Sequence, residues 1–433
     1  MPKASPVVRA GVKQPRQALR WVRHFWRALG PGVVTGAADD DPSGIVTYSI
    51  AGGEFGTKLL WLAPLSWPLM AAVQNMCARI GMVTGEGLMS GLRLKFPRWL
   101  LAVACLALLV ANTINIGADL TEMADAAEML TSVNSHLWVV LFGGMIAWAT
   151  VRLRYAIIAN VLKWLALVLF AYVITAVKLS PNWLNVFRDT FIPSMPRGAH
   201  AWGMVVAILG TTISPYLFFW QASQEVEEEK ALGRDTIVAR RGATAIEIGR
   251  RKVDVGVGTF FSNMAMYFII LTTALTMHAH GSPVPTSSRE VAETLRPLAG
   301  NFSALLFTLG ILGTGALAIP TLAGSAAYAF SELFGWRQGI DEHFRGAPAF
   351  YGVVLLAVAA GVTFDFANFN SLKLLYATAV INGVLAPFLL TGILFAASDR
   401  KLMNDQPSSR LSLGIVGCTT VVMFGATVAM FLT

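Results

Sequence analysis

The sequence predicts an all-α polytopic membrane protein built as two inverted halves of five helices, with helices 1 and 6 broken. Of 433 residues, 55% are hydrophobic and 13% are charged, whereas soluble domains carry about 25% charged residues. Two apolar segments are interrupted by proline, one at Asp41-Pro42 and the other at Ser214-Pro215. Interrupted spans at matching positions of two halves mark the binding site in proteins built from inverted repeats.

We expect about eleven transmembrane helices of roughly 20 residues each. They begin near Val33, Leu59, Leu100, Leu137, Ala156, Ala201, Gly256, Ala304, Phe350, Leu374 and Leu413. The chain then divides into an N-terminal segment, 1–29, and a transmembrane domain, 30–433. Within that domain we expect a first inverted repeat at 30–178, a second at 200–397 and an extra helix at 411–432.

The distribution of charge predicts the orientation. Residues 1–29 contain seven Lys and Arg and no acid, and later basic clusters recur in every second loop, as at 93–98, 240–252 and 400–410. Because cytoplasmic loops carry the excess of Lys and Arg, we expect a cytoplasmic N-terminus, an external C-terminus and a location in the cell inner membrane. The cations lie in short patches between apolar runs, which indicates the lipid bilayer as partner and no nucleic acid.

The first break contains three carboxylates at a depth where they are costly. Asp39, Asp40 and Asp41 lie inside the first apolar span, followed by Ser43 and Gly44. Intramembrane acids usually line an ion or substrate pathway. We therefore expect Asp41 to be a ligand, while Asp39 and Asp40 either line the pathway or cap and pair locally.

The second break adds neutral oxygens. Thr211, Ser214 and Tyr216 surround Pro215, and the unwound turns at both breaks leave backbone carbonyls free to face a cavity. An all-oxygen, net anionic site suits hard divalent cations such as Mg²⁺ and Mn²⁺. The three cysteines have unrelated spacings, and we find no Ser-His-Asp or Cys-His arrangement, so we expect neither an enzyme nor a cofactor.

Three motifs together resemble the NRAMP (natural resistance-associated macrophage protein) family of divalent metal transporters. They are Gly30-Pro31-Gly32 followed by Asp41-Pro42, the segment from Ala78 to Leu88, and Ile213-Ser214-Pro215. The resemblance implies a LeuT-type fold and alternating-access import of a divalent metal, commonly coupled to protons. We expect a monomer.

The motifs also depart from the family pattern. Gly44 replaces the first-span Asn that binds metal in the family, Ser214 replaces the sixth-span Met, and Tyr216 replaces a His. Loss of the thioether removes the soft ligand, which favours a hard ion. The sequence thus resembles the NRAMP-related branch that lacks this Met and admits Mg²⁺. Metal candidates are Asp41, Ser43, Gly44, Thr211 and Ser214.

Further candidates for the pathway or for coupling lie on other spans. Asp119 and Glu122 share a face of the third span and either carry protons or pair with a cation such as Lys163, while Asn382 on the tenth span either assists binding or joins helices. Tyr216 does not titrate near neutral pH. Three alternatives stay open: a LeuT-type carrier of a small organic substrate, a proton-coupled Mn²⁺ or Fe²⁺ importer, and a cation channel.

Overall fold

The computed structural model describes residues 31–154 and 167–433, apart from 197, 282–283, 286 and 368–369. The basic segment 1–29 lies outside these ranges, as does the first part of the expected fifth span. All regular elements within the described ranges are helices. They are α2 (Pro31–Asp39), α3 (Pro42–Phe55), α4 (Leu62–Thr84), α5 (Leu88–Leu92), α6 (Arg98–Thr131), α7 (Ser135–Arg152), α9 (Phe170–Lys178), α10 (Trp183–Phe191), α11 (Ala199–Thr212), α12 (Pro215–Ala231), α13 (Ile237–Arg240), α14 (Ala245–Thr276), α15 (Ser288–Glu293), α16 (Arg296–Ala299), α17 (Ser303–Phe334), α18 (Pro348–Asp365), α19 (Ser371–Ser398) and α20 (Arg410–Leu432), with short 3₁₀ turns between some of them.

Among the described residues, seven helical stretches are long and apolar enough to cross a membrane. They contain α6, α11 with α12, α14, α17, α18, α19 and α20. Helices α4 and α7 occupy two further expected positions, and α9 ends the fifth. The expected first span is divided into helices of 9 and 14 residues. Each of these is too short to be recognised by its length as a membrane-crossing helix. The expected all-α membrane class is confirmed.

Both predicted breaks are present and have the same local cause. Helix α2 ends at Asp39 and α3 begins at Pro42, while α11 ends at Thr212 and α12 begins at Pro215. The residues preceding the prolines, Asp41 (φ −69°, ψ 169°) and Ser214 (φ −75°, ψ 132°), are extended. Proline disfavours the helical conformation in the residue before it and is well placed in the first turn of the helix that follows.

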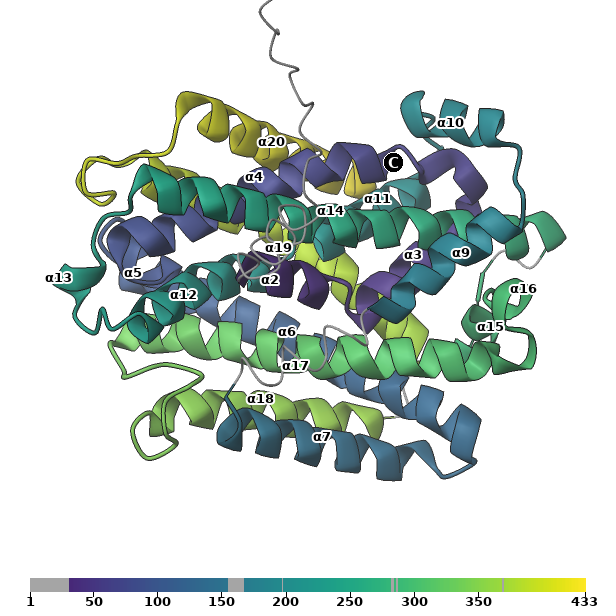
Figure 1. The fold of residues 1–433 in the computed structure, drawn as a ribbon, viewed down its shortest axis with the longest axis horizontal. Coiled ribbons are helices and arrows are strands. Elements are labelled where there is room, and N and C mark those ends of the chain that lie inside the picture. Colours follow the sequence, from purple (N-terminus) through teal and green to yellow (C-terminus); the bar gives the residue numbers. More distant parts are fainter. Residues whose placement is uncertain (1–30, 155–166, 197, 282–283, 286, 368–369) are drawn as a thin grey trace, which may run out of the picture.

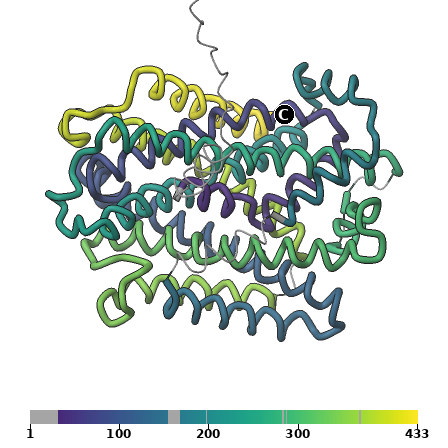
Figure 2. The backbone as a smooth tube through the Cα atoms, viewed as in Figure 1, coloured from purple at the N-terminus to yellow at the C-terminus, as the bar shows by residue number. Residues whose placement is uncertain are grey.

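Glycines bring the first span against α14. A Cβ added to Gly36 would lie 2.5 Å from the carbonyl carbon of Gly258, and one added to Gly258 would lie 2.3 Å from the carbonyl oxygen of Gly32. Such close backbone approach requires glycine and is typical of helix contacts in membranes. The tube in Figure 2 shows the start of the described chain at the middle of the molecule, with later helices around it.

The basic loops lie together at one end of the helix bundle. Figure 1 shows α5, α13 and the connection between α19 and α20 at the left, and α10, α15 and α16 at the opposite end. At the basic end Lys95 pairs with Asp399, and Arg79 donates to the carbonyl of Gln406 across 3.0 Å. The alternation of basic and non-basic loops therefore corresponds to two sides of the structure.

Candidate metal site at the two helix breaks

Asp41 lies at the centre of the first break and is 1% exposed. Its Oδ1 accepts the Ser43 hydroxyl at 2.7 Å and the Gly44 N–H at 2.8 Å, and its Oδ2 accepts the Asn115 amide at 2.9 Å. Asp41 is thus the N-cap of α3, a role for which Asp is among the preferred residues. The carboxylate is held in place by three donors, and it has a structural role that the sequence analysis did not include.

The second break is joined to the first. The Tyr216 hydroxyl, on α12, donates to the carbonyl of Ala38 on α2 across 3.0 Å. A Cβ on Gly44 would lie 3.1 Å from the Thr211 hydroxyl oxygen. The structure therefore brings Asp41, Ser43, Gly44, Thr211 and Tyr216 into one buried region, although their sequence positions are some 170 residues apart.

Ser214, the N-cap of α12, turns its hydroxyl back toward the last turn of α11. Its Oγ lies 2.8 Å from the carbonyl oxygen of Gly210 and 2.7 Å from that of Thr211. One hydroxyl proton can serve only one of these acceptors at a time, and the Ser214 oxygen keeps its lone pairs. The Ala38 carbonyl accepts the Tyr216 hydroxyl, and the Thr211 carbonyl lies within hydrogen-bond distance of the Ser214 hydroxyl. Because a carbonyl oxygen has two lone pairs, each retains an acceptor position.

The other predicted acids surround the first break. Ser262 of α14 donates to Asp39 at 2.6 Å and lies 3.1 Å from Asp40. Asn115 also lies 3.5 Å from Asp119, so this amide lies between the third-span acid and Asp41. Glu122 is fully buried, and neither of its carboxylate oxygens has a hydrogen-bond partner among the described residues.

Asn382 is less closely connected to the breaks. It is 2% exposed on α19, and its Oδ1 has no partner in the described part of the chain. Its neighbour Gly383 packs on α11, since a Cβ on Gly210 would lie 2.3 Å from the Gly383 nitrogen. No hydrogen bond between described residues joins Asn382 to Asp41 or Thr211. Its assignment to the site stays a prediction.

The buried charge is uncompensated within the described residues. None of their ion pairs involves Asp39, Asp40, Asp41, Asp119 or Glu122. Lys163, the partner considered for the third-span acids, lies outside the described residues. Burying carboxylates without a cation is expensive. A bound cation would offset this cost.

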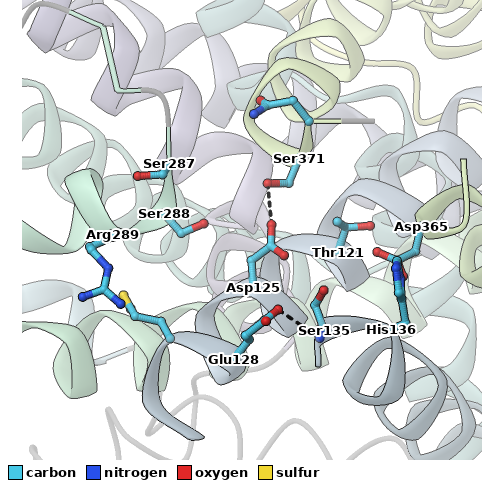
Figure 3. Close-up of a pocket in the computed structure, with 12 residues that line it drawn as sticks. Thr121, Asp125, Glu128, Ser135, His136, Ser287, Ser288, Arg289, Asp365 and Ser371 are labelled. Atoms are coloured by element: carbon cyan, nitrogen blue, oxygen red, sulfur yellow. Dashed lines mark hydrogen bonds and ion pairs between the residues drawn. The ribbon is translucent and has the colours of Figure 1, made fainter. Parts of the chain in front are cut away.

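A second acidic group was missed by the sequence analysis. A cavity of about 460 Å³ is lined by Asp125, Glu128, His136 and Asp365, among others. Figure 3 shows Asp125 beside Ser371, which donates to it at 2.9 Å, and His136 beside Asp365, with which it pairs. Asp119, Glu122, Asp125 and Glu128 recur every three residues along α6. That spacing was the available signal, because residues three apart are neighbours on a helix surface, so each acid lies next to the following one.

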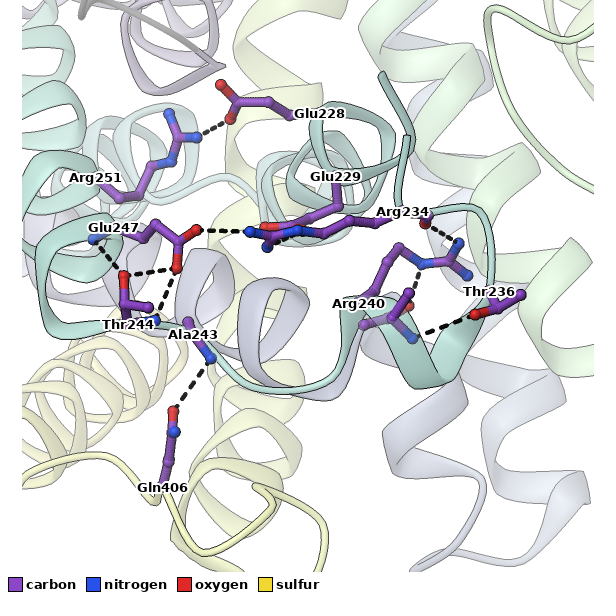
Figure 4. A network of polar contacts seen from close by, with 12 residues as sticks. Glu228, Glu229, Arg234, Thr236, Arg240, Ala243, Thr244, Glu247, Arg251 and Gln406 are labelled. Atoms are coloured by element: carbon purple, nitrogen blue, oxygen red, sulfur yellow. Dashed lines mark hydrogen bonds and ion pairs between the residues drawn. The ribbon is translucent and has the colours of Figure 1, made fainter. Parts of the chain in front are cut away.

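A further contact positions the start of α2. The N–H groups of Gly32 and Val33 donate to Asp254 of α14 at 2.8 and 3.3 Å. Asp254 also accepts from Arg251 at 2.6 Å, and Arg251 pairs with Glu225 and Glu228 of α12. Figure 4 shows the Arg251–Glu228 pair. One arginine thereby connects α12, α14 and the start of α2.

Residues 32–433 match the family model described as "Natural resistance-associated macrophage protein-like". The chain belongs to this Nramp family. A divalent metal cation transporter MntH of Caldanaerobacter subterraneus is 25% identical over 429 residues, covering 93% of each chain. One of Yersinia pestis is 27% identical over 304 residues, covering 68% of this chain and 71% of the relative.

Solved structures support the fold. The Eremococcus coleocola manganese transporter aligns with a TM-score of 0.73 at 16% identity, covering 95% of this chain and 86% of that one. Mhp1, a nucleobase-cation-symport-1 family transporter in a closed conformation, aligns with a TM-score of 0.57 at 14% identity, covering 94% and 90%. The LeuT-type fold and the Nramp resemblance are confirmed. The chain is therefore a multi-pass membrane transporter of divalent metal cations.

Proposed function

We propose that this Nramp protein imports Mg²⁺ or Mn²⁺ across the inner membrane by alternating access, with the ion held between the two helix breaks. Asp41 supplies the charged ligand, and Ser43, Gly44, Thr211 and Ser214 supply or shape the neutral oxygen environment. The observation that carries the proposal is the buried Asp41 carboxylate at the α2–α3 break, in contact with the α11–α12 break through neighbouring residues.

The nature of the ligands favours a hard ion that keeps part of its water shell. Among the described residues, no three His, Cys, Asp or Glu side chains converge as a metal-binding group. Coordination at the breaks then relies on one carboxylate, carbonyls, hydroxyls and water. Mg²⁺ is commonly bound in this way, through one or two carboxylates with several retained waters. Ser214, in place of a thioether, adds no soft ligand.

We propose that proton coupling involves the third span rather than the sixth. Tyr216 donates to a backbone carbonyl and is not a proton carrier near neutral pH. Asp119 lies beside Asn115, which contacts Asp41, and Glu122 follows one turn later on α6. Asp39, Asp40, Asp119 and Glu122 are therefore the proposed pathway and coupling groups. We also propose the cytoplasmic N-terminus and external C-terminus predicted from the basic loops.

The experiment is uptake by proteoliposomes that contain wild type or the Ser214→Met variant. Wild type is expected to transport Mg²⁺ and Mn²⁺ saturably. The variant regains a thioether and should raise the Mn²⁺ to Mg²⁺ preference about tenfold, since one weak extra ligand contributes on the order of 1.4 kcal/mol. Ser90→Met, outside both breaks, is the matched control. An unchanged preference in Ser214→Met would exclude this residue from the ion site.

A further inference from the structure

A second cavity lies at the basic end of the bundle, away from the helix breaks. It has a volume of about 150 Å³ and opens between α4, α14 and the start of α20. Three cations line it, Arg79, Arg251 and Lys252, and its lining contains no carboxylate. Arg79 belongs to the Ala78–Leu88 motif, which the proposed transport site does not use.

Two of the three cations have no carboxylate partner in the described part of the chain. Arg251 is neutralised by Glu225, Glu228 and Asp254. Arg79, in contrast, donates only to the carbonyls of Gln406 and Pro407, at 3.0 and 3.3 Å. Lys252 is exposed and forms no ion pair within the described ranges. The lining of the cavity therefore carries three cations and no acid, and Arg79 and Lys252 are available to an anion.

Several hydrogen-bond donors of this cavity lack acceptors. Ser408 is 6% exposed and lines the cavity, and its hydroxyl has no partner among the described residues. The buried Nε of Arg79 also has none there. Helix α20, which has 23 residues, begins directly after Ser409, whose hydroxyl caps the Ser412 N–H, and it brings the positive end of its dipole to the cavity. Buried donors without acceptors are costly, and an anion would satisfy them.

We propose that this cavity binds a phosphate group, carried by an anionic phospholipid of the adjoining leaflet or by free inorganic phosphate. Phosphate supplies oxygen acceptors for the Arg79 guanidinium, the Lys252 ammonium and the Ser408 hydroxyl. Helix N-termini are established anion sites, and basic pockets between membrane helices at the cytoplasmic side bind lipid headgroups. The cavity lies at the end of the bundle that gathers the basic loops.

The position of Arg251 gives the site a consequence for the transporter. Arg251 lines the cavity and also holds Asp254, which accepts the N–H groups at the start of α2. A phosphate in the cavity would add a contact to Arg251 beside those made by its carboxylate partners. Bound phosphate therefore stabilises the arrangement in which α2 is docked on α14.

The test uses the full-length purified protein and two probes. Native mass spectrometry measures retained phosphatidylglycerol against phosphatidylcholine, and thermal unfolding in detergent measures stabilisation by inorganic phosphate. The variants are Lys252→Gln, which changes an exposed side chain, and Ser408→Ala, which removes an unpartnered hydroxyl; both should fold. Arg250→Gln, an exposed cation adjacent in sequence but outside the cavity lining, is the charge-matched control.

Affinity for one of the probes should fall about tenfold in Lys252→Gln and in Ser408→Ala, because each variant loses one charge-assisted hydrogen bond. Affinity should stay at the wild-type value in Arg250→Gln. A loss confined to phosphatidylglycerol identifies the lipid headgroup, and a loss seen with inorganic phosphate identifies a soluble ligand; each supports the proposal. Unchanged affinity for both probes in both variants overturns it. An equal loss in Arg250→Gln also overturns it, because general surface charge then accounts for binding.

Discussion

Two substitutions of Asp41 separate its structural role from its proposed role as a metal ligand. Asp41→Asn keeps an oxygen that can cap α3, and Asn is as good an N-cap as Asp. The introduced amide would meet the Asn115 amide nitrogen, but the Oδ1 of Asn115 is buried without a partner among the described residues. A half-turn of the Asn115 amide about its Cβ–Cγ bond would place that oxygen opposite the introduced NH2 group, from which it can accept a hydrogen bond. Asp41→Ala offers no such replacement.

The expected magnitudes follow from these contacts. Asp41→Ala loses the cap, about 1 kcal/mol, and leaves the buried Asn115 amide without its acceptor, about 1–3 kcal/mol. The free energy of unfolding should fall by roughly 2–4 kcal/mol. Asp41→Asn should stay within about 1 kcal/mol of wild type, because it keeps an oxygen that caps α3 and a hydrogen-bond partner for Asn115. Both variants lose the carboxylate.

Metal affinity should fall at least about 100-fold in both variants, since even partners outside the ligand shell contribute roughly 10–100-fold. The assay is Mn²⁺ and Mg²⁺ titration calorimetry on full-length protein in detergent, with unfolding followed in parallel. Wild-type affinity in a stable Asp41→Asn variant would refute the ligand role. Equal stability of Asp41→Ala and Asp41→Asn would refute the capping argument.

Three further predictions concern the surroundings of the site. Gly36→Ala should destabilise the protein by about 1–3 kcal/mol, because its Cβ would lie 2.5 Å from the facing backbone of α14; in thermal unfolding, Gly249→Ala, whose Cβ meets nothing within 4 Å, should show no such loss. Asp254→Asn should speed hydrogen exchange of α2 about tenfold, since it weakens the bonds that hold the start of that helix; unchanged exchange would exclude this anchoring role. The hydrogen bond from Lys95 and those from neighbouring backbone N–H groups lower the pKa of Asp399 from 3.8 to about 2. The ionised Asp399 stabilises the fold at a pH above its unfolded-state pKa, and this stabilisation is lost as the pH falls through its folded-state pKa. Wild type should therefore be more stable than Asp399→Asn at neutral pH and lose that advantage between pH 3.8 and about 2. A constant difference in stability across this range would contradict the assignment.

The breaks and the sidedness of the loops were predictable because each has a local cause. Pro42 and Pro215 exclude helix in the residue before them, and the basic loops alternate along the chain. The structure confirmed both helix ends and placed the basic loops at one end of the bundle. The N-cap role of Asp41 could also have been predicted from neighbouring residues, since Asp followed by Pro is a helix-start signal. Asp41 was instead interpreted only as a ligand, because a buried charge is costly.

Contacts between distant segments were not predictable from pattern alone. Asn115 bonds Asp41 across 74 positions, and Asp254 holds Gly32 across 222. Amide and carboxylate side chains at these positions carry no periodic signal, because their partners are set by how whole helices pack. The same holds for the cavity around Ser408, whose lining comes from three segments of the chain. The domain boundaries and the metal-ligand assignments stay predictions.

The most direct test of the central claim is anomalous diffraction from crystals of the full-length protein grown with Mn²⁺. We predict an anomalous peak within coordination distance of the Asp41 carboxylate, between the α2–α3 and α11–α12 breaks. A peak found only elsewhere, for example among Asp125, Glu128 and Asp365, with none beside Asp41, would contradict it.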